Sequence, residues 1–294
     1  MIILLKRNLK NHFRTPASVI FSIVAVLIAF FVCAVFLENS MIDNVLQSAP
    51  KMDRESCRWL IECWIMAGLV SMTPVTASCG AFAIMIVDSE RKIIKDFKSS
   101  PLKKYDYPLA MVLCAAIAGF LISLVIMALY AVYIYIIAGV GFTVDQLLKT
   151  AGMALLTSVT GCCVHGFLLT YIKTLGGFSN YSTFLGTNIG FFNAIYLPMG
   201  SLPAFLRDVV KIVPYGHAAP IMRDILMAKP LEKVFGGAPD TTALMDFRKF
   251  FGVDFYLFDK TKISYSASII YMIVFAIICF ILFMARYNAK REQF

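Results

Sequence analysis

Residues 88–110 read DSERKIIKDFKSSPLKKYDYPLA, a stretch with six lysine and arginine residues that separates two of the most apolar segments of the chain. The 294-residue sequence is 60% hydrophobic and only 15% charged, and its mean hydropathy is +0.77. This composition differs strongly from that of a soluble globular domain. It predicts an integral membrane protein in which the charged stretch 88–110 connects two membrane segments.

Six apolar segments are long enough to cross the hydrocarbon core of a bilayer, which takes about 20 helical residues. They lie at about 17–37, 60–87, 107–138, 150–172, 178–198 and 267–286. A backbone in lipid must satisfy its own hydrogen bonds, and these segments are much longer than the ~10 residues of a barrel strand. The first segment is too long for a signal peptide and has no A-x-A cleavage pattern, so we expect it to be retained. The sequence therefore predicts an all-α integral membrane protein with six transmembrane helices in a single domain, residues 1–294.

The basic residues predict the orientation, because cytoplasmic loops carry an excess of lysine and arginine. Fourteen fall on one side of the predicted spans: Lys6, Arg7, Lys10, Arg14, Arg91, Lys92, Lys95, Lys98, Lys103, Lys104, Lys173, Arg286, Lys290 and Arg291. The short loops on the other side hold four: Lys51, Arg54, Arg58 and Lys149. We expect a multi-pass protein of the cell membrane with both termini in the cytoplasm and an external segment at 199–266. The net charge of +9 is then mainly a topogenic signal, and nucleic-acid binding is not indicated.

The charged stretch itself predicts a short cytoplasmic helix. Asp88 or Ser89 is expected to cap it, and Pro101 ends it, because proline disfavours helix in the preceding residue. The helix is about three turns long, with Ile93, Ile94 and Phe97 on one face and charged residues on the rest. This pattern fits an interfacial helix on anionic lipid headgroups, and it equally fits a docking site for a cytoplasmic partner.

The order of these features resembles a known family, the permeases of ATP-binding-cassette (ABC) transporters of the type 2 exporter class. The charged run Glu90, Arg91 and Lys92, followed by a short helix and by Ser100 and Pro101, looks like the cytoplasmic loop of that family. This chain has Ile93 and Ile94 where the family's loop often has glycine.

Two further segments carry the resemblance. Residues 197–226, LPMGSLPAFLRDVVKIVPYGHAAPIMRDIL, are similar to the family's pattern after the fifth span, and Pro203, Pro214, Tyr215 and Arg223 match it. The amino-terminal basic segment that ends in FRTP, residues 13–16, is similar to the family's interfacial elbow helix.

The resemblance implies a function for the stretch 88–110. Each chain would form half of a channel with a second permease, as a homodimer or heterodimer, and two separate cytoplasmic ABC ATPase subunits would bind ATP and Mg²⁺ and drive it. The ATPases would dock on a coupling helix between spans two and three, carried by Glu90, Arg91, Lys92, Ile93, Ile94 and Phe97. Pro203, Pro214, Tyr215 and Arg223 would belong to re-entrant helices that form the external gate.

The chain itself lacks the motifs of an enzyme. None of its 17 glycines is followed by lysine, so it has no P-loop, and no cluster of residues has metal-ligand or catalytic spacing. We therefore expect a transport subunit that binds no cofactor or metal. An ion-coupled carrier would bury several carboxylates within its spans. The apolar segments contain almost none, which makes an ion-coupled secondary transporter the weaker alternative.

A few residues are candidates for a substrate path. Glu62 is the exceptional carboxylate in the second span, and it is either part of such a path or an interfacial group beside Trp59 and Trp64. Phe184, Phe191 and Phe192 in the fifth span face either an amphiphilic substrate or lipid. We expect export of a drug, antimicrobial peptide or bacteriocin, with a lipid-linked polysaccharide as the alternative. Residues 236–266 are expected to form an external cap of limited order.

Overall fold

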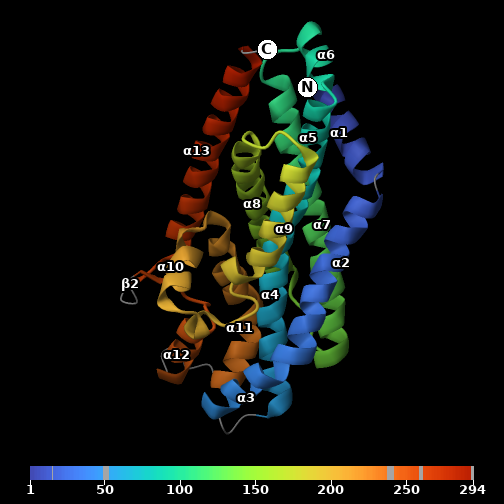
Figure 1. The fold of residues 1–294 in the computed structure, drawn as a ribbon. Helices are drawn as coiled ribbons and strands as arrows, with labels where there is room; N and C mark the ends of the chain where they lie inside the picture. Colours follow the sequence, from blue (N-terminus) through green and yellow to red (C-terminus); the bar gives the residue numbers. More distant parts are fainter. Residues whose placement is uncertain (15, 49–52, 237–241, 258–260, 293–294) are drawn as a thin grey trace.

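The computed structural model describes residues 1–14, 16–48, 53–236, 242–257 and 261–292. Thr15 of the FRTP segment and Lys51, which entered the charge count, lie outside these residues. The described chain is a bundle of helices with one small hairpin of strands, so the predicted all-α class is confirmed. The bundle is elongated, and the two termini lie at the same end (Figure 1).

The elements follow one another in this order. They are α1 (Ile2–Arg14), α2 (Pro16–Val32), the π-helical turn η1 (Cys33–Leu37), α3 (Glu38–Ser48), α4 (Arg54–Ala81), α5 (Ala83–Glu90), α6 (Ile93–Ser99), α7 (Asp106–Ala138), α8 (Val144–Leu169), α9 (Leu175–Phe192), η2 (Met199–Ser201), α10 (Ala204–Ile212), η3 (Pro214–His217), α11 (Ala218–Phe235), α12 (Thr242–Phe250), β1 (Tyr256–Leu257), β2 (Thr261–Lys262) and α13 (Tyr265–Glu292).

Five helical segments in the described chain are long and apolar enough to cross a membrane. They are Val26–Gln47, Arg54–Glu90, Asp106–Ala138, Val144–Leu169 and Tyr265–Ala289. These segments confirm a protein with several membrane spans. The helix at the first predicted segment, 17–37, is longer than expected. Its path continues from α2 through η1 into α3, as far as Ser48, without a turn.

The predicted fifth span, 178–198, is the exception. Its helix, α9, ends at Phe192, and the chain then leaves the helical path at Asn193 and Ala194, whose φ of 48° is left-handed. The 18 residues of α9 include Asn180 and Asn188 among several glycines, serines and threonines, and these polar groups keep it below the apolar content of a lipid-embedded span. The expected bounds are wrong, and six crossings are not confirmed.

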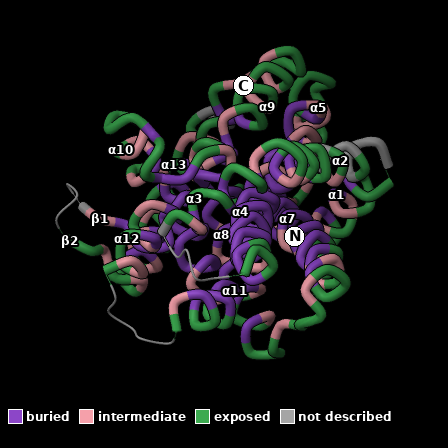
Figure 2. Tube along the Cα trace, turned by 90° about the horizontal axis from the view of Figure 1, so that it is seen from below, coloured by how far each residue is buried: buried purple, intermediate pink, exposed green. Residues whose placement is uncertain are grey.

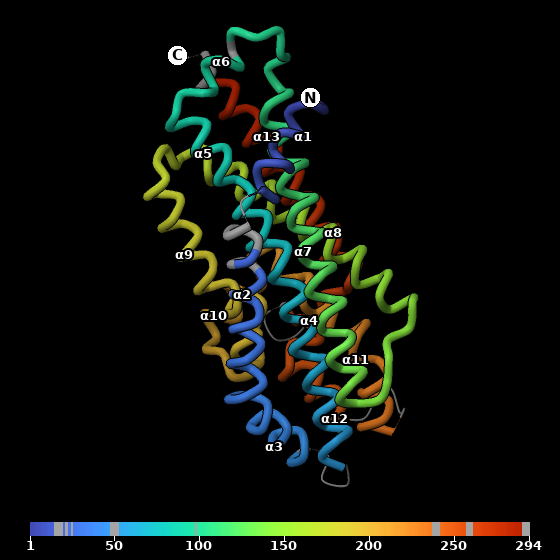
Figure 3. Tube along the Cα trace, turned by 90° about the vertical axis from the view of Figure 1, so that its right-hand side faces the viewer, coloured from blue at the N-terminus to red at the C-terminus, as the bar shows by residue number. Residues whose placement is uncertain are grey.

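The centre of the bundle is α4. Every residue from 60 to 75 is buried, because α7, α8 and α11 surround this helix and α2, α3 and α9 complete the layer. Figure 2 shows the buried core along α4, α7 and α8, with exposed residues on the outer helices. Seen from the side in Figure 3, α2 and α7 run beside α4. Helix α4 therefore extends through the core, and α5 continues its path to the end of the bundle that carries the termini.

The tightest approach in this core is at Gly119 of α7. A Cβ atom at this position would lie 2.4 Å from the Ser158 hydroxyl of α8 and 2.6 Å from the Pro74 carbonyl of α4. Ser158 also donates a hydrogen bond of 2.8 Å to the carbonyl of Ala116. Small side chains at such a crossing let three backbones approach closely.

We therefore predict that Gly119→Ala destabilises the protein by about 1–3 kcal/mol, since the added methyl group must push backbone apart. Gly152→Ala on α8 is the control, because a Cβ there meets nothing within 4 Å and alanine favours helix. Thermal unfolding of both variants in detergent measures the difference. Equal stability of the two variants would show that the crossing is looser than described.

Candidate functional site

The predicted coupling helix lies at the end of the bundle that carries both termini (Figure 1). The expected cap at Asp88 or Ser89 is wrong, because α5 continues through both residues to Glu90. The chain then turns at Arg91 and Lys92, where Lys92 has a left-handed φ of 61°. Helix α6 starts at Ile93 and has seven residues, so it is shorter than the three turns expected.

Asp88 has a different role from a cap. Its side chain is only 2% exposed, and Arg7 of α1 donates to both carboxylate oxygens, at 2.8 Å and 2.6 Å. Tyr107 of α7 donates a third hydrogen bond at 2.9 Å. A buried carboxylate needs such partners to offset its lost hydration. The carboxylate thus ties α1, α5 and α7 together directly beneath α6.

Aromatic contacts fix α6 to the same junction. The Arg7 guanidinium lies 5.1 Å from the centre of the Phe97 ring, and Phe97 also contacts Tyr107, with 5.4 Å between ring centres. Tyr107 stacks in turn on Tyr287 of α13. Hydrogen bonding to Asp88 raises the pKa of Arg7, although partial burial opposes the shift. The Arg7 guanidinium therefore stays charged in this cluster.

The two faces of the α5–α6 turn differ in exposure. Ile94 and Phe97 are half-buried against the protein's own core, and Ile93 is also half-buried. The charged residues are exposed instead: Glu90, Arg91, Lys92, Lys95 and Asp96. The surface that this turn offers to another molecule is consequently charged, with Ile93 at its edge.

At the opposite end of the bundle, Arg223 of α11 is fully buried. Its guanidinium donates to the carbonyls of Asn193 at 2.8 Å, Ala194 at 2.9 Å and Gly252 at 3.1 Å. It also lies 4.6 Å from the centre of the Trp64 ring. Burial lowers the pKa of Arg223 to about 9, which still leaves it protonated at neutral pH. One arginine thus holds the end of α9 and the segment after α12 against α4.

The other predicted gate residues surround a short helix. Helix α10 lies between Pro203, at its amino terminus, and Pro214, which opens η3. Pro214 and Tyr215 are buried, whereas Pro203 is exposed. His217 of η3 bonds the Ser268 hydroxyl of α13 at 3.0 Å and the Lys211 carbonyl at 2.7 Å. These contacts place α10 beside the first turns of α13.

The expected cap of limited order is wrong for the described residues. Helix α12 and the turn after it pack on the bundle, where Phe247, Phe251 and Val253 join the main core, and the paired strands β1 and β2 follow at the surface. Arg248 pairs with Asp224 at 2.6 Å and with Asp254 at 2.9 Å. The described residues that follow α11, through α12 to Val253, are therefore a folded part of the protein.

The candidate substrate-path residues do not converge. Glu62 is 1% exposed, and the hydroxyls of Tyr133 and Tyr130, on α7, donate to its carboxylate at 2.9 Å and 3.2 Å. Its neighbour Trp64 is fully buried and donates to the Phe251 carbonyl. Glu62 and Trp64 are therefore buried inside the bundle by contacts with the protein itself, and the interfacial position expected for Glu62 stays a prediction.

The predicted phenylalanines lie on α9, away from the α4–α7 interface that holds Glu62. Phe184 and Phe191 are exposed and Phe192 is half-buried. Exposed polar and small residues accompany them along this helix: Gly176, Ser179, Asn180, Thr183, Gly186 and Thr187. Helix α9 thus presents a mixed face of polar and aromatic groups.

Comparison with known proteins identifies the family. The family model described as ABC-2 type transporter matches residues 1–227. The chain belongs to the ABC-2 type transporter family. No curated protein matches it. The match confirms the resemblance drawn from the coupling loop and the gate segment, and it extends from α1 into α11. This ABC-2 chain is thus the permease, or membrane domain, of an ABC transporter.

Several residues of both ends of the permease were missed by sequence reasoning. Arg7 counted only as a topogenic charge and Tyr107 as part of a span, although together they hold Asp88. Trp64 was assigned to the membrane interface. The sequence does carry a signal for the cluster of Asp88, Arg7 and Tyr107. It is an acidic residue in the last turn of an apolar segment, together with an arginine in a basic amphipathic helix.

We predict that Asp88→Asn destabilises the permease by about 1.5–3 kcal/mol, because it removes the charge that accepts from Arg7. Tyr107→Phe removes one neutral donor and is expected to cost about 0.5–1.5 kcal/mol. Thermal unfolding in detergent ranks the two variants. A smaller effect for Asp88→Asn than for Tyr107→Phe would contradict the central position of the carboxylate.

Arg223→Met is expected to destabilise the permease by about 3 kcal/mol or more, since three buried carbonyls lose their donor. Lys229→Met, an exposed position on the same helix, should leave stability within about 0.5 kcal/mol. Hydrogen exchange should locate the loosening of Arg223→Met at the end of α9 and after α12. Loosening spread evenly over the bundle would argue against this local role.

Proposed function

We propose that this ABC-2 permease exports an amphiphilic substrate, such as a drug, an antimicrobial peptide or a bacteriocin, across the cell membrane. Separate ABC ATPase subunits, which bind ATP and Mg²⁺, supply the energy by docking on the α5–α6 turn. Both termini then face the cytoplasm, and α1 acts as the elbow helix. The chain itself contributes positioning and gating, with no catalytic step of its own.

The observation that carries this proposal is the construction of the α5–α6 turn. Its exposed charged residues, Glu90 to Lys92 with Lys95 and Asp96, are available to a partner, while Ile94 and Phe97 anchor it to the bundle. A docking site that transmits force must be attached to the element it moves. Here Asp88, Arg7 and Tyr107 attach the turn to α1 and α7.

The exposed face of α9 supports pairing with a second permease. Asparagine and threonine side chains are unfavourable toward lipid, and a Cβ at Gly186 would meet nothing within 4 Å. Gly190, four residues later on the same helix, packs instead on Tyr196 of its own chain. A second α9 opposite this face would create a polar and aromatic path suited to an amphiphile, and α9 would then serve as the sixth crossing.

The external gate is the third component of the proposal. Pro203 and Pro214 bound α10, and Tyr215 and Arg223 are buried behind it. Helix α10 is too short to cross a bilayer, which favours a re-entrant position in the outer leaflet. A lipid-linked polysaccharide stays the alternative substrate.

The docking proposal predicts that Arg91→Glu combined with Lys92→Glu reduces co-purification of the ATPase at least about tenfold, because two exposed contacts become repulsive. Lys149→Glu combined with Lys229→Glu, two exposed positions outside the α5–α6 turn, is the charge-matched control. Undiminished ATPase binding by the double variant would remove the basis for the docking site.

Labelling of Lys95→Cys provides the topology test, since the eight native cysteines are all buried. Reaction with an impermeant maleimide in intact cells would contradict a cytoplasmic turn.

A further inference from the structure

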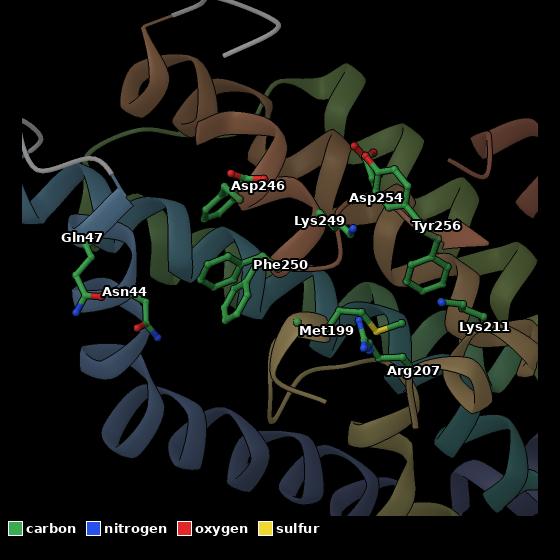
Figure 4. A pocket seen from close by; sticks show the side chains of 14 residues that line it. Asn44, Gln47, Met199, Arg207, Lys211, Asp246, Lys249, Phe250, Asp254 and Tyr256 are labelled. Carbon is green, nitrogen blue, oxygen red and sulfur yellow. The ribbon is translucent and has the colours of Figure 1, made fainter. Parts of the chain in front are cut away.

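Two hollows in the bundle differ in how nearby charges are balanced. The larger is a pocket of about 450 Å³ between α3, η2, α10 and α12 (Figure 4). Lys211 and Asp254, which line it, are paired within the protein, Lys211 with Asp208 at 3.2 Å and Asp254 with Arg248 at 2.9 Å. The smaller hollow, of about 100 Å³, lies between α2, α4 and α7. Beside it is a buried carboxylate with no ionic partner of its own.

This carboxylate is the side chain of Glu62. It accepts hydrogen bonds from the hydroxyls of Tyr130 and Tyr133, and none of the described residues forms an ion pair with it. Arg58, one turn earlier on α4, pairs instead with Glu38 of α3 at 2.7 Å. Both carboxylates are buried, since Glu38 is 5% and Glu62 1% exposed. Two buried carboxylates thus share one arginine, and the cluster lacks one positive charge.

The side chains around the cluster suit an organic cation better than a metal ion. The described chain has no group of three or more His, Cys, Asp or Glu residues that could hold a metal. Aromatic rings gather at the cluster instead. Phe30 of α2 packs edge-on against Tyr130 and Tyr133, with 5.1 Å and 5.0 Å between ring centres, and the two tyrosine rings lie 5.4 Å apart. Several aromatic rings around one position form the environment in which proteins bind ammonium groups.

The hollow gives access to these rings from the membrane. Phe30, Tyr130 and Tyr133 line it together with aliphatic side chains. Two of the aliphatic residues, Leu27 and Leu129, are 45% and 52% exposed on membrane-spanning helices, so the hollow opens toward lipid. Its volume of about 100 Å³ is well below the ~300 Å³ or more of a site for a whole drug-sized molecule. It therefore suits a head group whose attached tail stays in lipid.

We propose that this hollow binds the ammonium group of a cationic amphiphile, with the rings of Phe30, Tyr130 and Tyr133 against the cation and Glu62 behind the tyrosines. Hydrogen bonds to the carboxylate polarise both phenol groups and make their rings more attractive to a cation. The apolar tail lies along α2 and α7. This inference rests on the proposed export function and deepens it, because it narrows the amphiphilic substrate to a cationic one.

Isothermal titration calorimetry of the purified permease in a nonionic detergent tests the site. Decyltrimethylammonium is the cationic probe, and decyldimethylamine N-oxide, which has the same tail and no net charge, is its match. The cation should bind at least about tenfold more tightly. Glu62→Gln should remove this preference, because the amide keeps the shape of the side chain and loses its charge. Asp145→Asn, at an exposed position on α8, makes the same change of charge and should retain it.

Phe30→Leu is the second variant, and it keeps the test valid if Glu62→Gln does not fold. It removes one ring, retains an apolar side chain and should weaken binding of the cation about threefold or more.

The proposal would be overturned by equal binding of the two probes, or by an undiminished affinity for the cation in either variant. If neither probe binds and the stability of the native chain, but not of Glu62→Gln, depends on pH, then a proton supplies the missing charge and the proposal is wrong. The measurement includes no ATPase and no transport step. Failure of cation binding therefore leaves export of another amphiphile and the docking proposal intact, and failure of docking leaves the cation site intact.

Discussion

The structure depends on the burial of one helix, α4, along most of its length. Residues 60–75 are buried among other helices on every side. Lipid tails are as apolar as these side chains, so close van der Waals packing and hydrogen bonds between helices, and not the hydrophobic effect, hold the bundle together. Helix α5 continues α4 to Glu90 after a break at Phe82. Trp64 and Asp88, one at each candidate site, therefore stand on the same helical path.

This shared path gives the proposed transport mechanism a physical route. Under that mechanism, a displacement of α6 by an ATPase moves α5 through the short turn at Lys92, and α1 and α7 move with it through the carboxylate of Asp88. At the far end, α4 contacts Arg223 through the Trp64 ring. Close packing at Gly119 joins α7 and α8 to the same helix. Interiors packed in this way transmit displacement because they compress little.

The two ends hold their buried charges by different means. Asp88 has an ionic partner in Arg7 and a hydroxyl donor in Tyr107, and these side chains come from separate helices. Arg223 has three backbone carbonyls from two loops and an aromatic face. The first arrangement connects helices, whereas the second fixes loops that have no regular secondary structure to satisfy their carbonyls. Gly252 supports the second arrangement, since its φ of 65° suits glycine and a Cβ would approach Met199 and Arg223.

The sequence by itself determined the membrane class, the helical architecture, four of the spans within a few residues, and the family. Those properties follow from composition, from apolar length and from the order of local motifs, and none requires knowing which segments meet. Tertiary structure alone decided that Asp88 binds Arg7, that Glu62 and Trp64 are buried, that α9 ends at Phe192, and that α3, α10 and α12 enclose a pocket. These depend on contacts between residues tens to hundreds of positions apart, and such contacts leave no periodic signal in a single chain. In the sequence, Asp88 is compatible with a helix cap and with a buried ion pair. Only the position of Arg7, 81 residues away in the chain, decides between the two.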